Sequence, residues 1–126
     1  MLTRGQIRDY CSSKNGAWED FPFDLNTLVF RVGQKIFALT DVDDPVVRIN
    51  LKCDPELALG LREKYGQVTP GYHMNKKHWN TVLVDGAIPD SEILGLIDHS
   101  YELVFRSLKR SEQEAIEGGA GPMSRP

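Results

Sequence analysis

Cysteine is scarce in this chain of 126 residues, and long apolar runs are missing. The two cysteines, Cys11 and Cys53, lie far apart and form neither a metal-binding pair nor a redox pair. Small disulfide-stapled domains carry far more cysteine, so we expect both to be reduced thiols. No apolar stretch approaches the roughly 20 residues that span a bilayer, and the N-terminus has no signal-like apolar region. We therefore expect a soluble, cytoplasmic protein.

Positive charge is also in short supply. The formal net charge is −3, which argues against a dedicated electrostatic DNA binder. The charge is unevenly distributed, because residues 28–78 carry eight basic and six acidic side chains, whereas residues 79–126 carry four basic and eight acidic ones. Only the middle of the chain can therefore present a positive face.

The apolar pattern predicts one domain over residues 1–109. A capping box at Thr3 and Gln6 starts a first helix, and Asp54 and Pro55 start a second one. A five-membered stripe from Ile93 onward marks a long third helix. We expect helices over residues 3–13, 54–66 and 90–109, a strand at 17–20, a hairpin over 27–41, a strand over 45–53, and a strand pair at 72–74 and 79–84.

The strands arrive in hairpin groups, without a helix between each pair. This order favours an antiparallel sheet rather than a parallel one. We expect an α+β fold in which an antiparallel sheet has its helices packed on one face. Residues 110–126 hold few large apolar side chains and several glycines and prolines, which predicts a flexible C-terminal tail.

No catalytic or metal-binding constellation emerges from the residue types. His73 and His78 lie five positions apart and could bind one zinc ion, with Cys53 as a further candidate ligand. A zinc site needs three or four protein ligands, and the sequence offers no second cysteine–histidine pair. Cys53 stands just before a helix, where the dipole favours a thiolate, yet nucleophilic catalysis also needs a neighbouring base. A buried structural cysteine is the favoured alternative. We expect no metal, no cofactor and no enzymatic activity.

The stretch PGYHMNKKHWNTV, residues 70–82, concentrates polar and aromatic side chains in a predicted hairpin, and two interpretations of it stay open. In the first, lysines and polar residues contact phosphates while an aromatic ring stacks on bases. This DNA-contacting set is Lys35, Arg48, Lys52, Tyr72, Asn75, Lys76 and Lys77. In the second, a groove beside the hairpin binds a partner. The groove set is Tyr72, His73, Trp79 and Asn80.

Three stretches resemble the MmcQ/YjbR family of small bacterial proteins. They are KIFALTD, KCDPELALGLREKYGQVTPGYHMNKKHWNTVLVDG and IPDSEILGLIDHSYELV, in the family's order and spacing. The resemblance covers most of residues 1–109 and implies an α+β sandwich of the secretion-chaperone-like or CyaY-like kind. It also implies DNA binding through a double wing, in which two β-hairpins grip DNA. On this sequence we expect the wings around Gly33–Lys35 and Asn75–Lys77.

Two functional hypotheses follow. The first is a non-enzymatic monomer that binds double-stranded DNA through the two hairpins and the basic central segment. The second is a module that binds a protein partner or a small ligand in the groove beside the hairpin. A positive ridge joining the hairpin tips favours the first hypothesis, and a concave pocket at the groove residues favours the second.

Overall fold

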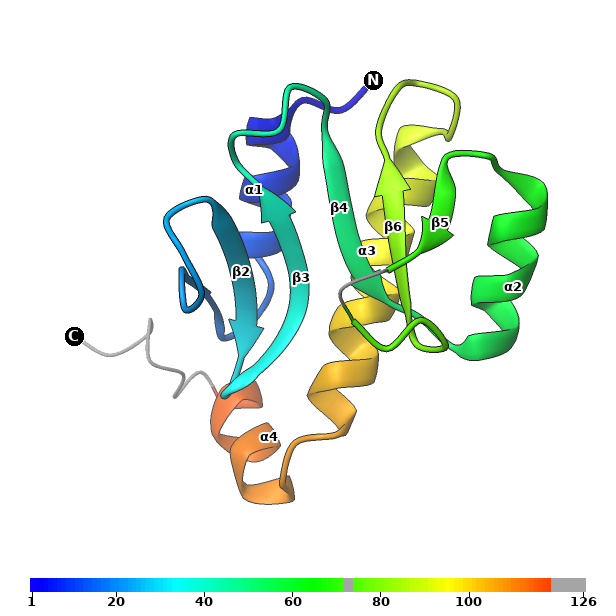
Figure 1. The fold of residues 1–126 in the computed structure, drawn as a ribbon. Helices are drawn as coiled ribbons and strands as arrows, with labels where there is room; N and C mark the ends of the chain where they lie inside the picture. Colours follow the sequence, from blue (N-terminus) through cyan, green and yellow to red (C-terminus); the bar gives the residue numbers. More distant parts are fainter. Residues whose placement is uncertain (72–73, 119–126) are drawn as a thin grey trace.

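A six-stranded antiparallel sheet with strand order β1-β2-β3-β4-β6-β5 forms the centre of the protein. The structure is a computed structural model that describes residues 1–71 and 74–118 (Figure 1). Its elements are α1 (Arg4–Ser12), β1 (Ala17–Asp20), β2 (Thr27–Val32), β3 (Lys35–Asp41), β4 (Arg48–Lys52), α2 (Pro55–Lys64), β5 (Val68–Pro70), β6 (Trp79–Leu83), α3 (Asp90–Arg106) and α4 (Arg110–Glu117). The expected α+β fold is confirmed.

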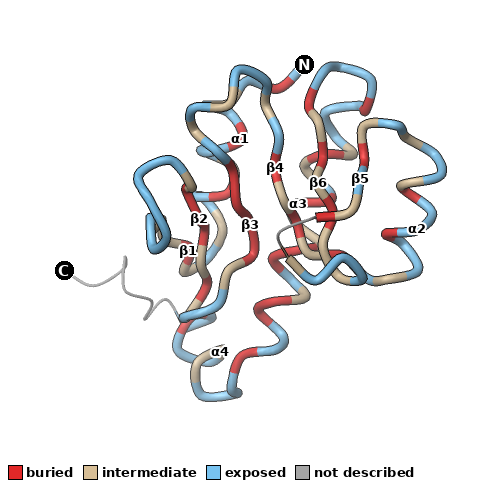
Figure 2. The backbone as a smooth tube through the Cα atoms, viewed as in Figure 1, coloured by how far each residue is buried: buried red, intermediate tan, exposed pale blue. Residues whose placement is uncertain are grey.

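Helices α1 and α3 cover one face of the sheet and leave the other face open (Figure 1). Buried residues follow the central strands and the inner side of α3, whereas the hairpin turns are exposed (Figure 2). On β4, Ile49 and Leu51 are buried. Arg48 and Asn50, which alternate with them along the strand, line the open face, as the geometry of a β-strand requires. None of the described helices is long and apolar enough to cross a membrane.

The sheet consists of two halves that join through a short ladder. Strands β3 and β4 share only the pairs Ala38–Leu51 and Leu39–Asn50. By contrast, β4 pairs with β6 from Arg48 to Lys52, along its whole length. Beyond the short ladder, β3 curves away from β4 (Figure 1). The hairpin β2-β3 and the hairpin β5-β6 therefore project as separate arms on either side of β4.

Ser100 of α3 ties the two halves together from the helical face. Its side chain is fully buried. The Ser100 hydroxyl donates to the Phe37 carbonyl of β3 at 2.6 Å and accepts from the Lys52 N–H of β4 at 2.9 Å. Phe37 and Lys52 are not paired in the β3-β4 ladder. The Ser100 hydroxyl therefore supplies the hydrogen-bond partner for one backbone group of each strand.

We expect Ser100→Ala to lower the free energy of unfolding by about 1–3 kcal/mol, because two backbone groups lose their hydrogen-bond partner. The matched control is Ser91→Ala, an exposed serine at the start of the same helix, which should cost less than about 0.5 kcal/mol. Urea denaturation of the two variants measures both values. An equally small loss in both would show that Ser100 does not hold the halves together.

Several local predictions are confirmed in detail. The Thr3 hydroxyl accepts from the Gln6 N–H and the Gln6 side chain accepts from the Thr3 N–H, which completes the capping box of α1. Asp54 caps α2, and Pro55 occupies its first turn. The β2-β3 turn uses Gly33 at φ +59°, in the left-handed region that glycine adopts without a steric penalty.

The strand predicted at residues 72–74 differs from the structure. The partner of β6 is β5, because Val68 supplies the buried side chain and Pro70, which has no N–H, ends the strand. Met74 lies in a loop, and Tyr72 and His73 lie outside the described residues. Gly71 and residues 74–78 belong to no strand, so the partner of β6 ends earlier in the chain than predicted.

The C-terminal region also differs from the prediction. Helix α3 ends at Arg106 rather than near residue 109, and α4 occupies residues 110–117, where we expected a flexible tail. The reason is one apolar side chain. Ile116 is buried, and it lies so close to the α1-β1 turn that a Cβ at Gly16 would stand 2.9 Å from it. Asn15 also donates its side-chain N–H to the Ile116 carbonyl at 3.2 Å.

Candidate functional site

Both predicted wings lie at the same end of the sheet. The β2-β3 turn stands at this end, and β4 runs antiparallel to β3, so β4 finishes there at Lys52. Strand β6 runs antiparallel to β4 and begins there at Trp79, directly after the loop residues 74–78. Figure 1 shows both connections on the lower side of the sheet. We name this region the hairpin end and define it as residues 33–36, 52–54 and 74–79.

Four lysines from the predicted DNA-contacting set gather at the hairpin end. They are Lys35, Lys52, Lys76 and Lys77. Lys35, Lys76 and Lys77 are exposed and Lys52 is half-buried. Within the described part of the chain, no carboxylate forms an ion pair with Lys35, Lys52 or Lys77. Lys35 instead donates to the Ser107 carbonyl at 3.1 Å, at the negative end of α3. The positive charge of these three ammonium groups is therefore not neutralised by a neighbouring acid.

Arg62 of α2 fixes the loop that carries Lys76 and Lys77. Its Nε donates to the Asn80 Oδ1 at 2.7 Å, and its Nη2 donates to the carbonyls of Lys76 at 2.5 Å and Trp79 at 3.3 Å. Arg62 is not among the residues predicted from the sequence. Its one sequence signal is Asn80, a polar side chain at an inward position of a strand, which requires a hydrogen-bond partner when buried.

Asn75 shapes the loop from within. Its Oδ1 accepts from the Lys77 N–H at 3.0 Å, and its carbonyl accepts from the N–H groups of His78 and Trp79 at 3.0 and 2.9 Å. These bonds are typical of an asparagine that stabilises a turn. Asn75 therefore positions the two lysines, a role different from the direct DNA contact that we predicted for its side chain.

We expect Arg62→Ala to loosen the loop and to destabilise the protein by about 1–3 kcal/mol, since the buried Asn80 amide loses its partner. The backbone N–H groups of His78 and Trp79 should then exchange with solvent about ten- to a hundredfold faster. Arg110→Ala is the control, because the Arg110 side chain is 90% exposed and pairs only with Glu114 within α4. Hydrogen exchange by NMR distinguishes the two. Unchanged exchange in Arg62→Ala would contradict the positioning role.

Two of the predicted contact residues do not join the hairpin end. Arg48 begins β4, whereas Lys52 ends it, so their backbones stand about 13 Å apart along the strand. Arg48 pairs with Asp44 at 2.7 Å, at the opposite end of the sheet. Tyr72 falls outside the described residues.

The two described members of the groove set lie on different faces of the sheet. Trp79 and Asn80 are consecutive residues of β6 and therefore point to opposite faces of the sheet. Asn80 is 2% exposed and bonds to Arg62, while Trp79 is half-buried on the other side. Tyr72 and His73, the remaining two members, lie outside the described residues.

The thiol and metal hypotheses find no support in the described residues. Burial raises the pKa of the Cys53 thiol to about 11 and that of the Cys11 thiol to about 12. Both groups are therefore protonated at neutral pH and lack the thiolate that nucleophilic attack requires. Within residues 1–71 and 74–118, no group of three or more His, Cys, Asp or Glu side chains could hold a metal ion. His73 lies outside these residues.

Comparisons with known proteins find relatives over most of the chain. A family model described as YjbR matches residues 12–103. The chain is 33% identical over 115 residues to YjbR of Escherichia coli strain K12, which covers 91% of this chain and 98% of that protein. The crystal structure of Deinococcus radiodurans protein DR2400 superposes with a TM-score of 0.87 at 38% identity, over 96% of this chain and 92% of that one. A crystal structure from Pseudomonas syringae gives a TM-score of 0.71 at 36% identity, over 82% and 99%.

Proposed function

Because the chain belongs to the YjbR family, we propose that its hairpin end binds the sugar–phosphate backbone of double-stranded DNA, as the resemblance to a double-wing protein implies. The observation that carries the proposal is the gathering of Lys35, Lys52, Lys76 and Lys77 at one end of the sheet. In this proposal the protein is a cytoplasmic monomer without enzymatic activity. Its lysines contact phosphates, and phosphate contacts supply affinity without sequence preference.

The spacing of the two arms supports this proposal. Neighbouring strands lie about 4.8 Å apart, so the centres of the β2-β3 and β5-β6 hairpins are separated by about 14 Å at the level of the ladder. The separation is larger at the hairpin end, where β3 and β4 diverge. The separation of about 14 Å at the ladder is on the scale of the DNA major groove, which is about 12 Å wide. The two arms can therefore reach phosphates on both sides of one groove.

The overall charge of the protein limits how tightly it can bind. With a net charge of −3, long-range attraction to DNA is weak, and short-range contacts at the hairpin end must supply the affinity. Four phosphate contacts correspond to a slope of about −3.6 in a plot of log K against log salt concentration. The same four contacts give a Kd on the order of 10 µM at 50 mM salt.

Fluorescence anisotropy with a labelled duplex, between about 50 and 200 mM salt, tests the proposal. We expect binding to weaken by about 150-fold across this range. Two duplexes of unrelated sequence should bind equally well, because the contacts are to the backbone. The absence of binding at 50 mM salt, or binding that does not respond to salt, would overturn the proposal.

A further inference from the structure

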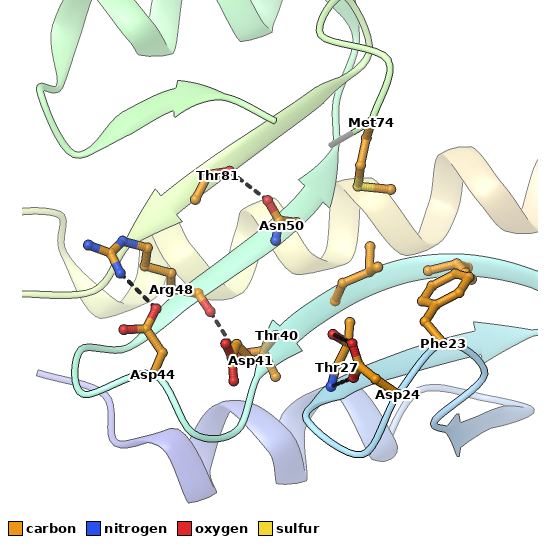
Figure 3. A pocket seen from close by; sticks show the side chains of 12 residues that line it. Phe23, Asp24, Thr27, Thr40, Asp41, Asp44, Arg48, Asn50, Met74 and Thr81 are labelled. Carbon is orange, nitrogen blue, oxygen red and sulfur yellow. Dashed lines mark hydrogen bonds and ion pairs between the residues drawn. The ribbon is translucent and has the colours of Figure 1, made fainter. Parts of the chain in front are cut away.

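The open face of the sheet holds a hollow that is separate from the hairpin end. Its volume is about 740 Å³, within the range of about 300–1,000 Å³ that small-molecule sites occupy. Side chains of β3, β4 and β6 form its floor, and the loop over residues 21–26 forms one wall (Figure 3). Two of its lining residues, Ile36 and Met74, belong to the hairpin end. The lining includes none of the four lysines, so the hollow offers a second binding surface of different chemistry.

One side of the hollow is apolar. Phe23, Ile36, Leu39 and Met74 line it, and Figure 3 shows Phe23 and Met74 on the same side. Phe23 is 66% exposed, although removal of an aromatic ring from water lowers the free energy. An apolar group of a ligand seated here would cover this ring.

The other side of the hollow is acidic. Asp41 and Asp44 lie away from Phe23, whereas Asp24 lies next to it (Figure 3). With Arg48 as the one cation of the lining, the hollow has a net charge of −2. Arg48 pairs with Asp44. Within the described part of the chain, neither the Asp24 nor the Asp41 carboxylate forms an ion pair, although the Arg4 guanidinium donates to the Asp41 backbone carbonyl at 2.8 Å. Backbone N–H groups of Thr27 and Asn26 hydrogen-bond to the Asp24 carboxylate and lower its pKa, so it is ionised at neutral pH.

The floor between the two sides is polar but neutral. The Thr81 hydroxyl of β6 donates to the Asn50 Oδ1 of β4 at 2.5 Å. Figure 3 shows this pair between Arg48 and Met74. The hollow thus has an apolar side, a neutral floor and an anionic side, an arrangement that repels phosphate and complements an amphipathic cation.

We propose that this hollow binds a small organic cation, an amine or guanidinium attached to an aromatic or branched aliphatic group. The apolar group contacts Phe23 and Met74, and the cationic group lies next to the Asp41 carboxylate. Charge complementarity selects the cation, and the apolar side selects against simple metal ions and polyamines. The site is independent of DNA binding, since it shares no lysine with the hairpin end.

An NMR titration of the ¹⁵N-labelled protein tests this inference with tryptamine as the probe and indole-3-propionate as its anionic counterpart. We expect tryptamine to produce saturable shifts at Thr27, Leu39, Asn50 and Thr81, while indole-3-propionate leaves these signals in place. Equal shifts with both compounds, or none with tryptamine, would overturn the proposal. Binding of a short lysine–leucine peptide in the absence of tryptamine binding would replace the small cation with a protein segment and equally overturn it.

Two substitutions locate the ligand within the hollow. Asp41→Asn should weaken tryptamine binding by about two- to fivefold, the scale of one solvent-exposed charge pair. Asp43→Asn, an exposed neighbour that does not line the hollow, is the matched control and should leave the Kd unchanged. Phe23→Ala should weaken binding further without unfolding the protein, because Phe23 is mostly exposed. The same Kd in Asp41→Asn and Asp43→Asn would place the cation elsewhere. None of these changes should alter the salt dependence of DNA binding.

Discussion

Replacing Lys76 and Lys77 together by alanine should nearly abolish DNA binding. Each phosphate contact contributes about −0.9 to the salt slope, so the double variant should show a slope of about −1.8 in place of −3.6. Extrapolation to 50 mM salt gives a loss of affinity on the order of 200-fold. Anisotropy titrations of wild type and variant, with the same duplex and at several salt concentrations, measure both quantities.

A matched double variant shows whether the position of the charge matters. Arg48→Ala with Lys64→Ala removes the same number of positive charges far from the hairpin end. Arg48 stands at the other end of β4, and Lys64 ends α2, which starts beside the hairpin end and extends about 15 Å away from it. We expect this variant to retain the wild-type slope. If the control lost as much affinity as Lys76→Ala with Lys77→Ala, the hairpin end would not be the contact surface.

Phe37→Ala should have the largest effect on stability. Its side chain is fully buried, with ring centroids 5.3 Å from Tyr101 and 6.3 Å from Phe30. Truncation of such a ring removes its burial and leaves a cavity, at a cost of about 3–5 kcal/mol. The melting temperature should fall by on the order of 10–20 °C. Calorimetry or thermal circular dichroism provides the measurement.

Phe23→Ala is the control for this effect. Phe23 is 66% exposed, so its truncation should change the free energy of unfolding by less than about 0.5 kcal/mol. The contrast between two phenylalanines in one chain separates burial from residue type. A small loss for Phe37→Ala would mean that its neighbours collapse into the space, and the two halves of the sheet would then be joined less rigidly than the structure indicates.

The sequence predicted the elements whose signals are local. The capping box at Thr3 and the Asp54–Pro55 helix start each depend on neighbours within a few residues, and the structure confirms both. The family resemblance also gave the fold class. By contrast, the strand that pairs with β6 was predicted at residues 72–74, whereas it lies at Val68–Pro70. The two segments are adjacent and short, and the sequence pattern does not distinguish between them.

The rest depends on contacts between distant residues. Helix α4 forms where Ile116 packs beside Gly16, and no local pattern signals that contact. Arg62 was missed for the same reason, since its partners lie in a different element of the fold. Arg48 and Lys52 belong to one predicted contact set, but the strand pairing shows that the two stand at opposite ends of the sheet.

The most direct test of the account is to locate the DNA on the protein. An NMR titration of the ¹⁵N-labelled protein with a short duplex at low salt should shift the amide signals of residues 33–36, 52–54 and 74–78. Signals of residues 43–48, at the opposite end of the sheet, should stay in place. This pattern would place the DNA across both hairpins. Shifts centred on residues 43–48, or on the open face of the sheet, would contradict the proposal that the hairpin end is the DNA-binding surface.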